Sequence, residues 1–349
     1  MALRNMSQLN ERYSRQMLFP EIGEPGQKKL NESRVAILGC GALGTVQADA
    51  LCRAGVGWLR IVDRDFIEES NLQRQTLFSE EDVRAGLPKA IAAQRRLRQI
   101  NSRVEIDAQV TDINHHNIES LVQGASCVLD ATDNFETRFL INDVAVKHRI
   151  PWIYGAAVGS YGLSMAVVPG KTPCLRCVFE TMPPPGMSPT CDTAGVLSSI
   201  VNIVASLQVA EALKILTGNW HRLHGKMLYC DIWENVWRRF EVAGAREQGD
   251  CPACQRNEFE FLEGKHGSSV TTLCGRDSVQ INLPGEHQVD FQQLASRLKG
   301  LGAVSFNRFL LRFAVESYEI TVFSDGRSIV KGTKDSNIAR SLYAKYIGT

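Results

Sequence analysis

Three glycines and one acidic residue near the start of the chain have the spacing of a nucleotide-binding site. Gly39, Gly41 and Gly44 form a GxGxxG pattern, and Asp63 follows about twenty residues later. Glycines let a backbone approach phosphates, a following helix offers unpaired N–H groups, and an acidic side chain can bind ribose hydroxyls. This pattern alone fits an NAD-linked oxidoreductase, an ATP-dependent enzyme, or a turn that binds nothing.

A set of cationic, amide and acidic side chains further along the chain favours ATP. Asn71 and Arg74 lie in the run SNLQRQ that starts at Ser70, Lys89 begins a predicted helix, and Asp133 follows a predicted strand. Arginine and lysine neutralise phosphates, asparagine donates hydrogen bonds to them, and a carboxylate oxygen suits Mg²⁺. Hydride transfer needs no such set, because its chemistry takes place on the nicotinamide ring.

Two CxxC pairs, Cys174 with Cys177 and Cys251 with Cys254, offer four thiolates for a metal. Four soft sulfur ligands suit a tetrahedral structural Zn²⁺. The 73 residues between the pairs exceed the gap of an ordinary zinc ribbon, so a pair of redox dithiols is the alternative. A zinc ion here would fasten the end of the first domain to its middle.

Cys191 follows a proline-rich segment and lies at the start of an apolar stretch that predicts a helix. A helix N-terminus lowers the pKa of a thiol and favours the thiolate. Cys191 is therefore a candidate nucleophile, and a small buried thiol is an equally good interpretation.

Alternating strand and helix patterns must position these residues. Apolar runs predict strands at 34–38, 58–63, 104–109 and 127–131, separated by helical patterns up to Ala54, at 88–100 and at 118–123. This alternation predicts an α/β fold, a Rossmann-like mainly parallel sheet with flanking helices. Residues 154–168 continue the pattern as a further strand, and 226–233 and 237–241 add two more.

A second, smaller domain is predicted after a linker-like segment, EGKHGSS, that starts at Glu263. We expect domains at 1–260 and 268–349. The second contains five strand patterns and helical patterns at 290–299 and 335–346, which predicts a small α+β module.

Composition excludes several function classes. The 349 residues include 39 Lys plus Arg and 38 Asp plus Glu, so the formal charge of +1 favours neither nucleic acid nor an anionic membrane. The first thirty residues lack the apolar segment of a secretory signal. The apolar stretch 193–217 carries Asn202, Gln208, Glu211 and Lys214, so we expect a buried helix and not a membrane span. These features predict a cytoplasmic protein.

The motifs taken together resemble the ThiF/MoeB family of adenylyltransferases, the bacterial relatives of ubiquitin-activating enzymes. The resemblance covers residues 8–255 and rests on RYSRQ from Arg12, GCGALG, VDRD, SNLQRQ, GLPK and DATDN. It implies ATP-dependent adenylation of the C-terminal glycine carboxylate of a small ubiquitin-fold sulfur carrier ending in Gly-Gly, with release of pyrophosphate. A ThiS-like carrier of thiamine thiazole biosynthesis is the main expectation. A MoaD-like carrier of molybdopterin biosynthesis and a peptide carboxylate are the alternatives, and a non-catalytic scaffold represents another class.

The resemblance also implies roles for individual residues. Asp63 would bind ribose, Asn71, Arg74 and Lys89 the phosphates, and Asp133 Mg²⁺, while Arg15 would reach the ATP of the other subunit in a homodimer. Cys191 would link to the carrier or handle sulfur. The extra C-terminal module is similar to the tail of longer ThiF-like proteins, and we interpret it as a docking module for the carrier or a downstream enzyme. The candidate ATP-binding residues are Gly39, Gly41, Gly44, Asp63, Asp65, Ser70, Asn71, Arg74, Lys89 and Asp133.

Overall fold

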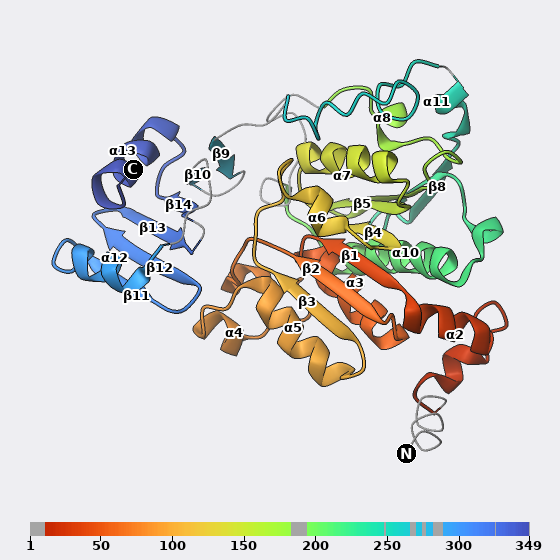
Figure 1. Ribbon diagram of the computed structural model, residues 1–349, viewed down its shortest axis with the longest axis horizontal. Coiled ribbons are helices and arrows are strands. Elements are labelled where there is room, and N and C mark those ends of the chain that lie inside the picture. The colour runs from red at the N-terminus through yellow and green to blue at the C-terminus, as the bar shows by residue number, and fades with distance from the viewer. Residues whose placement is uncertain are drawn as a thin grey trace. The chain divides into compact units, whose positions relative to one another are not determined.

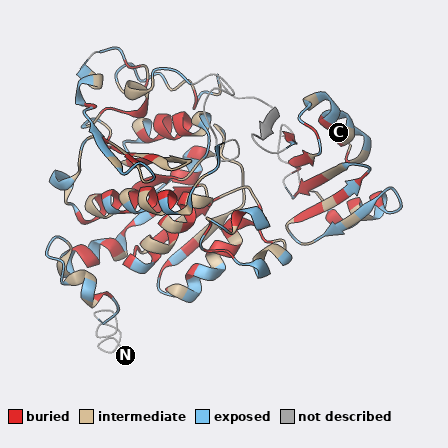
Figure 2. Cartoon of the chain, turned by 180° about the vertical axis from the view of Figure 1, so that it is seen from behind, coloured by how far each residue is buried: buried red, intermediate tan, exposed pale blue. Residues whose placement is uncertain are grey.

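The computed structural model describes residues 11–182, 194–247, 249–265, 270–273, 277–281, 289–324 and 326–348. The chain divides into two compact units, Met1–Pro189 with Val196–His266, and Thr190–Gly195 with Gly267–Thr349. Each unit has its own buried core, so each is described by itself (Figure 2).

An eight-stranded sheet forms the centre of the first unit (Figure 1). Its spatial order is β3-β2-β1-β4-β5-β6-β7-β8. The pairs from β3 to β5 are parallel, and the pairs from β5 to β8 are antiparallel. The strands are β1 (Arg34–Leu38), β2 (Trp58–Val62), β3 (Glu105–Gln109), β4 (Cys127–Asp130), β5 (Trp152–Val158), β6 (Tyr161–Val167), β7 (Met227–Asp231) and β8 (Val236–Phe240).

Helices cover both faces of this sheet, as expected of an α/β fold (Figure 1). On one face α10 packs along α3 and against β5 and β6, and α5 packs beside α3. On the other face α6 and α7 pack over the core that contains Ala36 and Leu38 of β1. The helices are α2 (Gly23–Glu32), α3 (Ala42–Ala54), α4 (Glu80–Arg84), α5 (Lys89–Ile100), α6 (Ile118–Val122), α7 (Phe135–His148), α8 (Leu175–Val178), α10 (Ser198–Thr217) and α11 (Ala243–Glu247), with short 3-10 turns η1 (Glu69–Asn71) and η2 (Trp220–Arg222).

The strand order reverses between β1 and β4, which creates the usual binding position of such a fold. From β1 the chain proceeds outward to β2 and β3, and then returns to place β4 on the other side of β1. Ligands of open α/β sheets bind at the carboxyl ends of the strands where this reversal occurs. The loops that follow β1, β2 and β4 therefore meet at this edge, and they carry most of the predicted nucleotide-site residues.

Several described elements differ from the sequence expectation, and two of them belong to the centre of the first unit. The expected strand at 154–168 is a hairpin of β5 and β6 that turns at Gly159, whose φ is +58°. Helix α7 was not expected, because buried polar residues interrupt its apolar pattern. Arg138, Asn142 and Asp143 are all buried in it, so no single apolar stripe marks the helix.

Helix α10 lies in the core, as its polar residues predict. It is the one described helix that is long and apolar enough to span a membrane, and 61% of its most apolar window is buried. Gln208 within it is fully buried and donates hydrogen bonds to the carbonyls of Asp130 and Ile153.

The second unit is an antiparallel sheet with two helices, as predicted for an α+β module, but its sheet has six strands because β9 was not among the five expected. Its strand order is β11-β12-β13-β14-β10-β9. Helices α12 and α13 cover a core that includes Leu294, Phe313 and Tyr343. The elements are β9 (Val270–Leu273), β10 (Ser278–Ile281), α12 (Phe291–Leu298), β11 (Ala303–Phe306), β12 (Leu310–Val315), β13 (Tyr318–Phe323), β14 (Ser328–Lys331) and α13 (Ser336–Tyr346).

Candidate nucleotide site and cysteine cluster

The three glycines after β1 have different structural requirements. Gly39 has φ +99°, and a Cβ there would lie 2.4 Å from the carbonyl oxygen of Ala131. A Cβ on Gly44 would lie 2.2 Å from the carbonyl oxygen of Gly39, so this glycine allows α3 to begin close to the turn. Gly41 has a negative φ, and the nearest atom to its Cβ position is Gln75 Nε2 at 3.9 Å. The protein itself leaves room at Gly41, which suits close approach by a ligand.

Asp63, at the end of β2, is tied to this turn by its carboxylate. Its Oδ2 accepts the backbone N–H of Cys40 at 2.6 Å, and its Oδ1 accepts that of Asp65 at 2.7 Å. Burial raises the pKa of Asp63, and the nearby Lys89 opposes that rise. The side chain of Lys89 is only 5% exposed, and its Nζ lies 3.1 Å from Asp65 Oδ2. The buried ammonium group of Lys89 and the carboxylate of Asp63, the candidate ribose ligand, thus lie near the carboxyl end of β2.

Asn71 and Gln75 carry buried polar atoms that the protein leaves without partners. Asn71 Oδ1 accepts the backbone N–H of Glu68 at 3.0 Å, which fixes its orientation. Its Nδ2 and the Oε1 of Gln75 are buried and have no hydrogen-bond partner among the described residues. Because an unsatisfied buried polar atom is costly, these atoms fit a bound polar ligand, and the Nε2 of the same Gln75 side chain lies 3.9 Å from the Cβ position of Gly41 in the glycine turn. The sequence motifs assign Gln75 no role, although it lies in the same run, SNLQRQ.

Arg74 and Asp133 present their charged groups at the surface. Arg74 is partly exposed, and its Nη1 donates to the carbonyl of Ser70 at 2.9 Å. Asp133 is exposed and lies in the loop after β4. Its hard carboxylate oxygens are of the kind that Mg²⁺ binds.

Arg64 is a member of this charged group that the sequence reasoning missed. It lies between Asp63 and Asp65, and its Nη1 lies 2.7 Å from Asp112 Oδ1 after β3. Burial opposes the charge on Arg64, but Asp112, Asp65 and Asp133 outweigh it and raise the arginine pKa. The only sequence signal for it is a cation placed between two aspartates.

Arg15 and Cys191 are the two remaining candidates from the sequence. Arg15 is exposed on the helical residues 11–17, and it has no hydrogen-bond or ion-pair partner in the described part of the chain. Cys191 lies outside the described residues. The cysteine's proposed role therefore stays a prediction.

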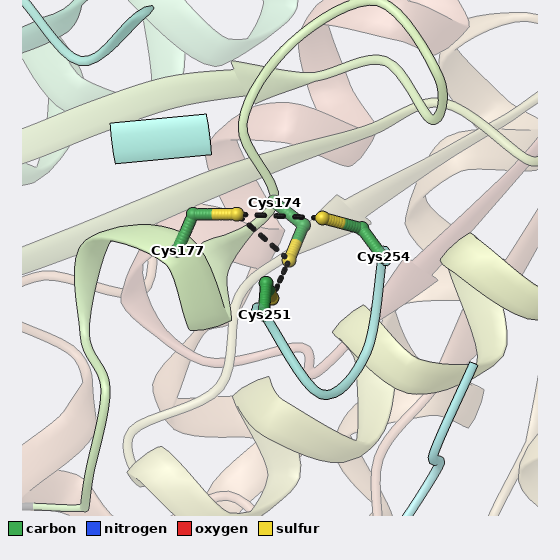
Figure 3. A group of neighbouring side chains, drawn as sticks. All are labelled: Cys174, Cys177, Cys251 and Cys254. Atoms are coloured by element: carbon green, nitrogen blue, oxygen red, sulfur yellow. Dashed lines mark hydrogen bonds between the residues drawn. The ribbon is translucent and has the colours of Figure 1, made fainter. Parts of the chain in front are cut away.

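The four predicted metal-ligating cysteines lie close together, although Cys251 and Cys254 are each 77 residues further along the chain than Cys174 and Cys177 (Figure 3). Their Sγ atoms all lie within 4.8 Å of one another, with Cys174 and Cys251 3.6 Å apart and Cys177 and Cys254 3.4 Å apart. Four sulfurs around a tetrahedral zinc with Zn–S bonds of about 2.3 Å would be about 3.8 Å apart. Hydrogen bonds from Cys174 and Cys177 lower the pKa of Cys254.

Helix α7 fastens both cysteine segments. Asn142 Oδ1 accepts the backbone N–H of Leu175, next to Cys174, at 2.8 Å. Asp143 Oδ2 accepts the backbone N–H groups of Phe261 and Leu262, at 3.0 and 3.4 Å. These contacts explain why a helix in the core carries two buried polar residues in succession.

Known proteins are similar to this chain over most of its length. Residues 13–253 match the model of the ThiF family. The sulfur carrier protein ThiS adenylyltransferase of Bacillus subtilis is 47% identical over 97% of this chain and 99% of its own length. A sulfur carrier protein adenylyltransferase of Thermus thermophilus is 39% identical over 70% of this chain and 90% of its own length. The crystal structure of E. coli MccB with ATP has a TM-score of 0.57 at 25% identity, covering 66% of this chain and 69% of that one.

Proposed function

The chain belongs to the ThiF family, and from that premise we propose that it uses ATP to adenylate the C-terminal glycine carboxylate of a ThiS-like sulfur-carrier protein. The observation that carries the proposal is the combination of an open glycine turn, the buried Lys89 and the buried Nδ2 of Asn71, which has no hydrogen-bond partner among the described residues. The relative that matches nearly the whole chain is named as a ThiS adenylyltransferase, so we prefer a ThiS-like carrier. A MoaD-like carrier and a peptide carboxylate are the alternatives.

The charges of the site suit the reaction. A carboxylate oxygen of the carrier forms a bond to the α-phosphorus of ATP, and the bond between that phosphorus and the β-phosphate bridging oxygen breaks. Both reactants are anions, so the protein must reduce their repulsion and favour pyrophosphate as the leaving group. Arg74 and Lys89 supply positive charge, the glycine turn and the start of α3 supply backbone N–H groups, and Asn71 Nδ2 is a free buried donor.

Two metal ions belong to this proposal. Asp133, an exposed hard-oxygen ligand, would hold Mg²⁺, which supplies charge neutralisation on the phosphates when bound. The four cysteines would hold Zn²⁺, because the spacing of their sulfurs fits a tetrahedral site. The zinc would join the segment after β6 to the end of the first unit.

Partners and location complete the proposal. We assign the enzyme to the cytoplasm, as a homodimer in which Arg15 of one subunit reaches the ATP of the other. The C-terminal unit, which begins at 267, would dock the carrier or a downstream enzyme. A chain that ends at residue 265 and keeps full affinity both for its carrier and for the downstream enzyme would exclude that docking role.

The roles of the charged residues can be separated from that of Cys191 by mutation. We expect Arg74→Ala and Asp133→Ala to abolish ATP–pyrophosphate exchange with the carrier, because each removes charge that the reacting phosphates need. Cys191→Ala should keep the exchange and lose only later sulfur transfer. Circular dichroism and zinc content serve as controls of folding. Loss of exchange in a folded, zinc-containing Cys191→Ala protein would contradict this division of roles.

A further inference from the structure

The loop between β4 and α7 is fixed on both sides of Asp133. On one side, Asp130 Oδ1 accepts the backbone N–H of Thr132 at 2.9 Å and its hydroxyl at 2.7 Å. On the other side, Asn134 caps α7, and its Oδ1 accepts the backbone N–H of Thr137 at 2.8 Å. Asp133 itself stays exposed between these two anchors.

A buried guanidinium group completes the first anchor. Arg138 Nε lies 3.2 Å from Asp130 Oδ2, and Arg138 Nη2 donates to the carbonyl of Thr132 at 2.8 Å and more weakly to that of Gly155 at 3.4 Å. The side chains of Arg138 and Asp130 are 8% and 0% exposed. The guanidinium also lies 5.4 Å from the ring centres of Phe135 and Tyr154, which close it off.

Arg138 and Asp130 are buried, so they are poorly placed to bind a ligand directly. They are well placed to fix the conformation of the loop between β4 and α7. A buried ion pair adds little net stability compared with apolar packing, because both charges lose their hydration. The planar fork of arginine, in contrast, holds several acceptors in fixed directions, which a lysine cannot do. The three acceptors here are the end of β4, the residue before Asp133 and a carbonyl of β5, so Arg138 ties the loop to the sheet.

The same loop touches the glycine turn. A Cβ at Gly39 would lie 2.4 Å from Ala131 O and 3.3 Å from Thr132 N. Any displacement of residues 131 and 132 would therefore alter the turn that follows β1 as well as Asp133. The loop has little freedom of its own, and its position depends on the anchor that Arg138 completes.

We propose that Arg138 is a positioning residue, which holds the Asp133 carboxylate where Mg·ATP needs it without touching the nucleotide. The inference rests on the proposed function, since it assumes that Asp133 is the Mg²⁺ ligand. It adds a residue in α7, an element that the motifs did not reveal, and assigns Asp130 to the same anchor instead of to a metal.

The test measures how nucleotide binding depends on Mg²⁺, using the full chain loaded with zinc. Titration calorimetry gives the affinity for ATP in EDTA and at a series of Mg²⁺ concentrations. For Arg138→Gln we expect the Mg²⁺ concentration for half-maximal gain in affinity to rise at least about tenfold, the equivalent of one lost charge-assisted hydrogen bond. The affinity for ATP in EDTA should change less than about twofold.

The chain offers a matched control in Arg60. Its guanidinium is also paired with a carboxylate, Asp107, and donates to the carbonyls of Ser120 and Leu121, but it has no contact with the loop of Asp133. Arg60→Gln should lower thermal stability and leave the Mg²⁺ dependence unchanged. Arg138→Lys should recover part of the stability and keep the shifted Mg²⁺ dependence, because its ammonium group cannot form the fork.

Two experiments with milder substitutions test the inference if Arg138→Gln does not fold. Thr132→Val removes one hydroxyl contact to Asp130 and should shift the Mg²⁺ dependence in the same direction. In an Asp133→Asn background, Arg138→Lys should add no further shift, as expected for two residues that act through one group. Identical Mg²⁺ dependence in wild type, Arg138→Lys and Thr132→Val would overturn the inference. A wild-type protein that binds no ATP at all would instead overturn the proposed function and, with it, the inference.

Discussion

Single residues at the sheet edge separate into those that the fold requires and those that it leaves available. Gly39 and Gly44 are required, because a side chain at either would collide with backbone. Gly41 meets no such collision, and the buried Nδ2 of Asn71 has no hydrogen-bond partner among the described residues, although its Oδ1 accepts the backbone N–H of Glu68. Atoms that the fold does not use are the best candidates for contacts with ATP.

Paired glycine substitutions test this distinction. Gly39→Ala should prevent stable folding, because it combines a positive φ with a collision at 2.4 Å. Gly41→Ala should fold and lose no more than about 1 kcal/mol of unfolding free energy, since alanine is a poorer helix N-cap than glycine. It should nevertheless weaken ATP binding by at least about tenfold, because the new methyl occupies the space of the phosphates.

The measurements are urea unfolding and ATP titration of the same preparations. Gly44→Ala is the second structural control and should resemble Gly39→Ala. Unchanged ATP affinity in a folded Gly41→Ala protein would contradict the placement of the phosphates at this turn.

Sequence motifs locate these residues well, but not the residues that hold them. The GxGxxG pattern and the acidic residues after strands are visible in one dimension, because their chemistry depends on type and spacing. Arg64 and Arg138 could not be predicted, since their roles depend on which carboxylates the fold brings near them. Asn71 was predicted as a donor, whereas its unpartnered Nδ2 is visible only in three dimensions.

At the scale of elements, α7 connects the two sites of the first unit. Its first turns hold the loop of Asp133 through Arg138, and one turn further on Asn142 and Asp143 hold the two cysteine segments. The strands and most helices follow from apolar periodicity, whereas α7 does not, because its buried polar residues break that periodicity. The expectation of one strand at 154–168 is also wrong, because the chain turns back at Gly159 and forms the antiparallel pair β5 and β6.

The carboxyl group of Asp143 makes the stability of this element depend on pH. Burial raises its pKa to about 7, although two backbone N–H groups favour the charged form. In the unfolded chain an aspartate has a pKa of about 3.9. Between these values the folded protein holds a proton that the unfolded chain has released, so this group's contribution to stability falls as pH rises from about 4 to 7 and is constant above that.

Asp143→Asn should remove this dependence while its amide oxygen still accepts both N–H groups. Relative to Asp143→Asn, the wild type should lose on the order of 2 kcal/mol of unfolding free energy between pH 5.5 and 8. Urea unfolding of both proteins at matched zinc content measures the difference, and loss of zinc in acid affects both alike because all four cysteines are kept. Parallel pH profiles would show that the carboxyl group is not buried as described.

At the scale of the whole molecule, the relatives differ in how much of this chain they cover. The Thermus relative is matched over 90% of its own length by only 70% of this chain, whereas the Bacillus relative is matched over nearly all of both. The second unit has its own apolar core and its own sheet. Adenylation is therefore expected of the first unit, with the second adding selectivity for a partner.

Subunit mixing tests the proposed homodimer. Arg15→Ala and Asp133→Ala should each be inactive in ATP–pyrophosphate exchange, because every site lacks one essential residue. Mixed dimers of the two variants would contain one site with both residues, if Arg15 acts across the interface. Coexpression should therefore restore roughly a quarter of the wild-type exchange rate, as random pairing predicts. Failure to recover activity in purified mixed dimers would place Arg15 in its own subunit's site.

The central claim is tested most directly by ATP–pyrophosphate exchange with purified carriers that end in Gly-Gly. Each ThiS-like and MoaD-like carrier is compared with a version that lacks its last glycine. We expect Mg²⁺-dependent exchange with the intact ThiS-like carrier and none with its shortened form, because the terminal carboxylate is the attacking group. Exchange that is independent of any carrier's C-terminus, or absent with every carrier although ATP binds, would contradict the claim and redirect the search to a peptide carboxylate.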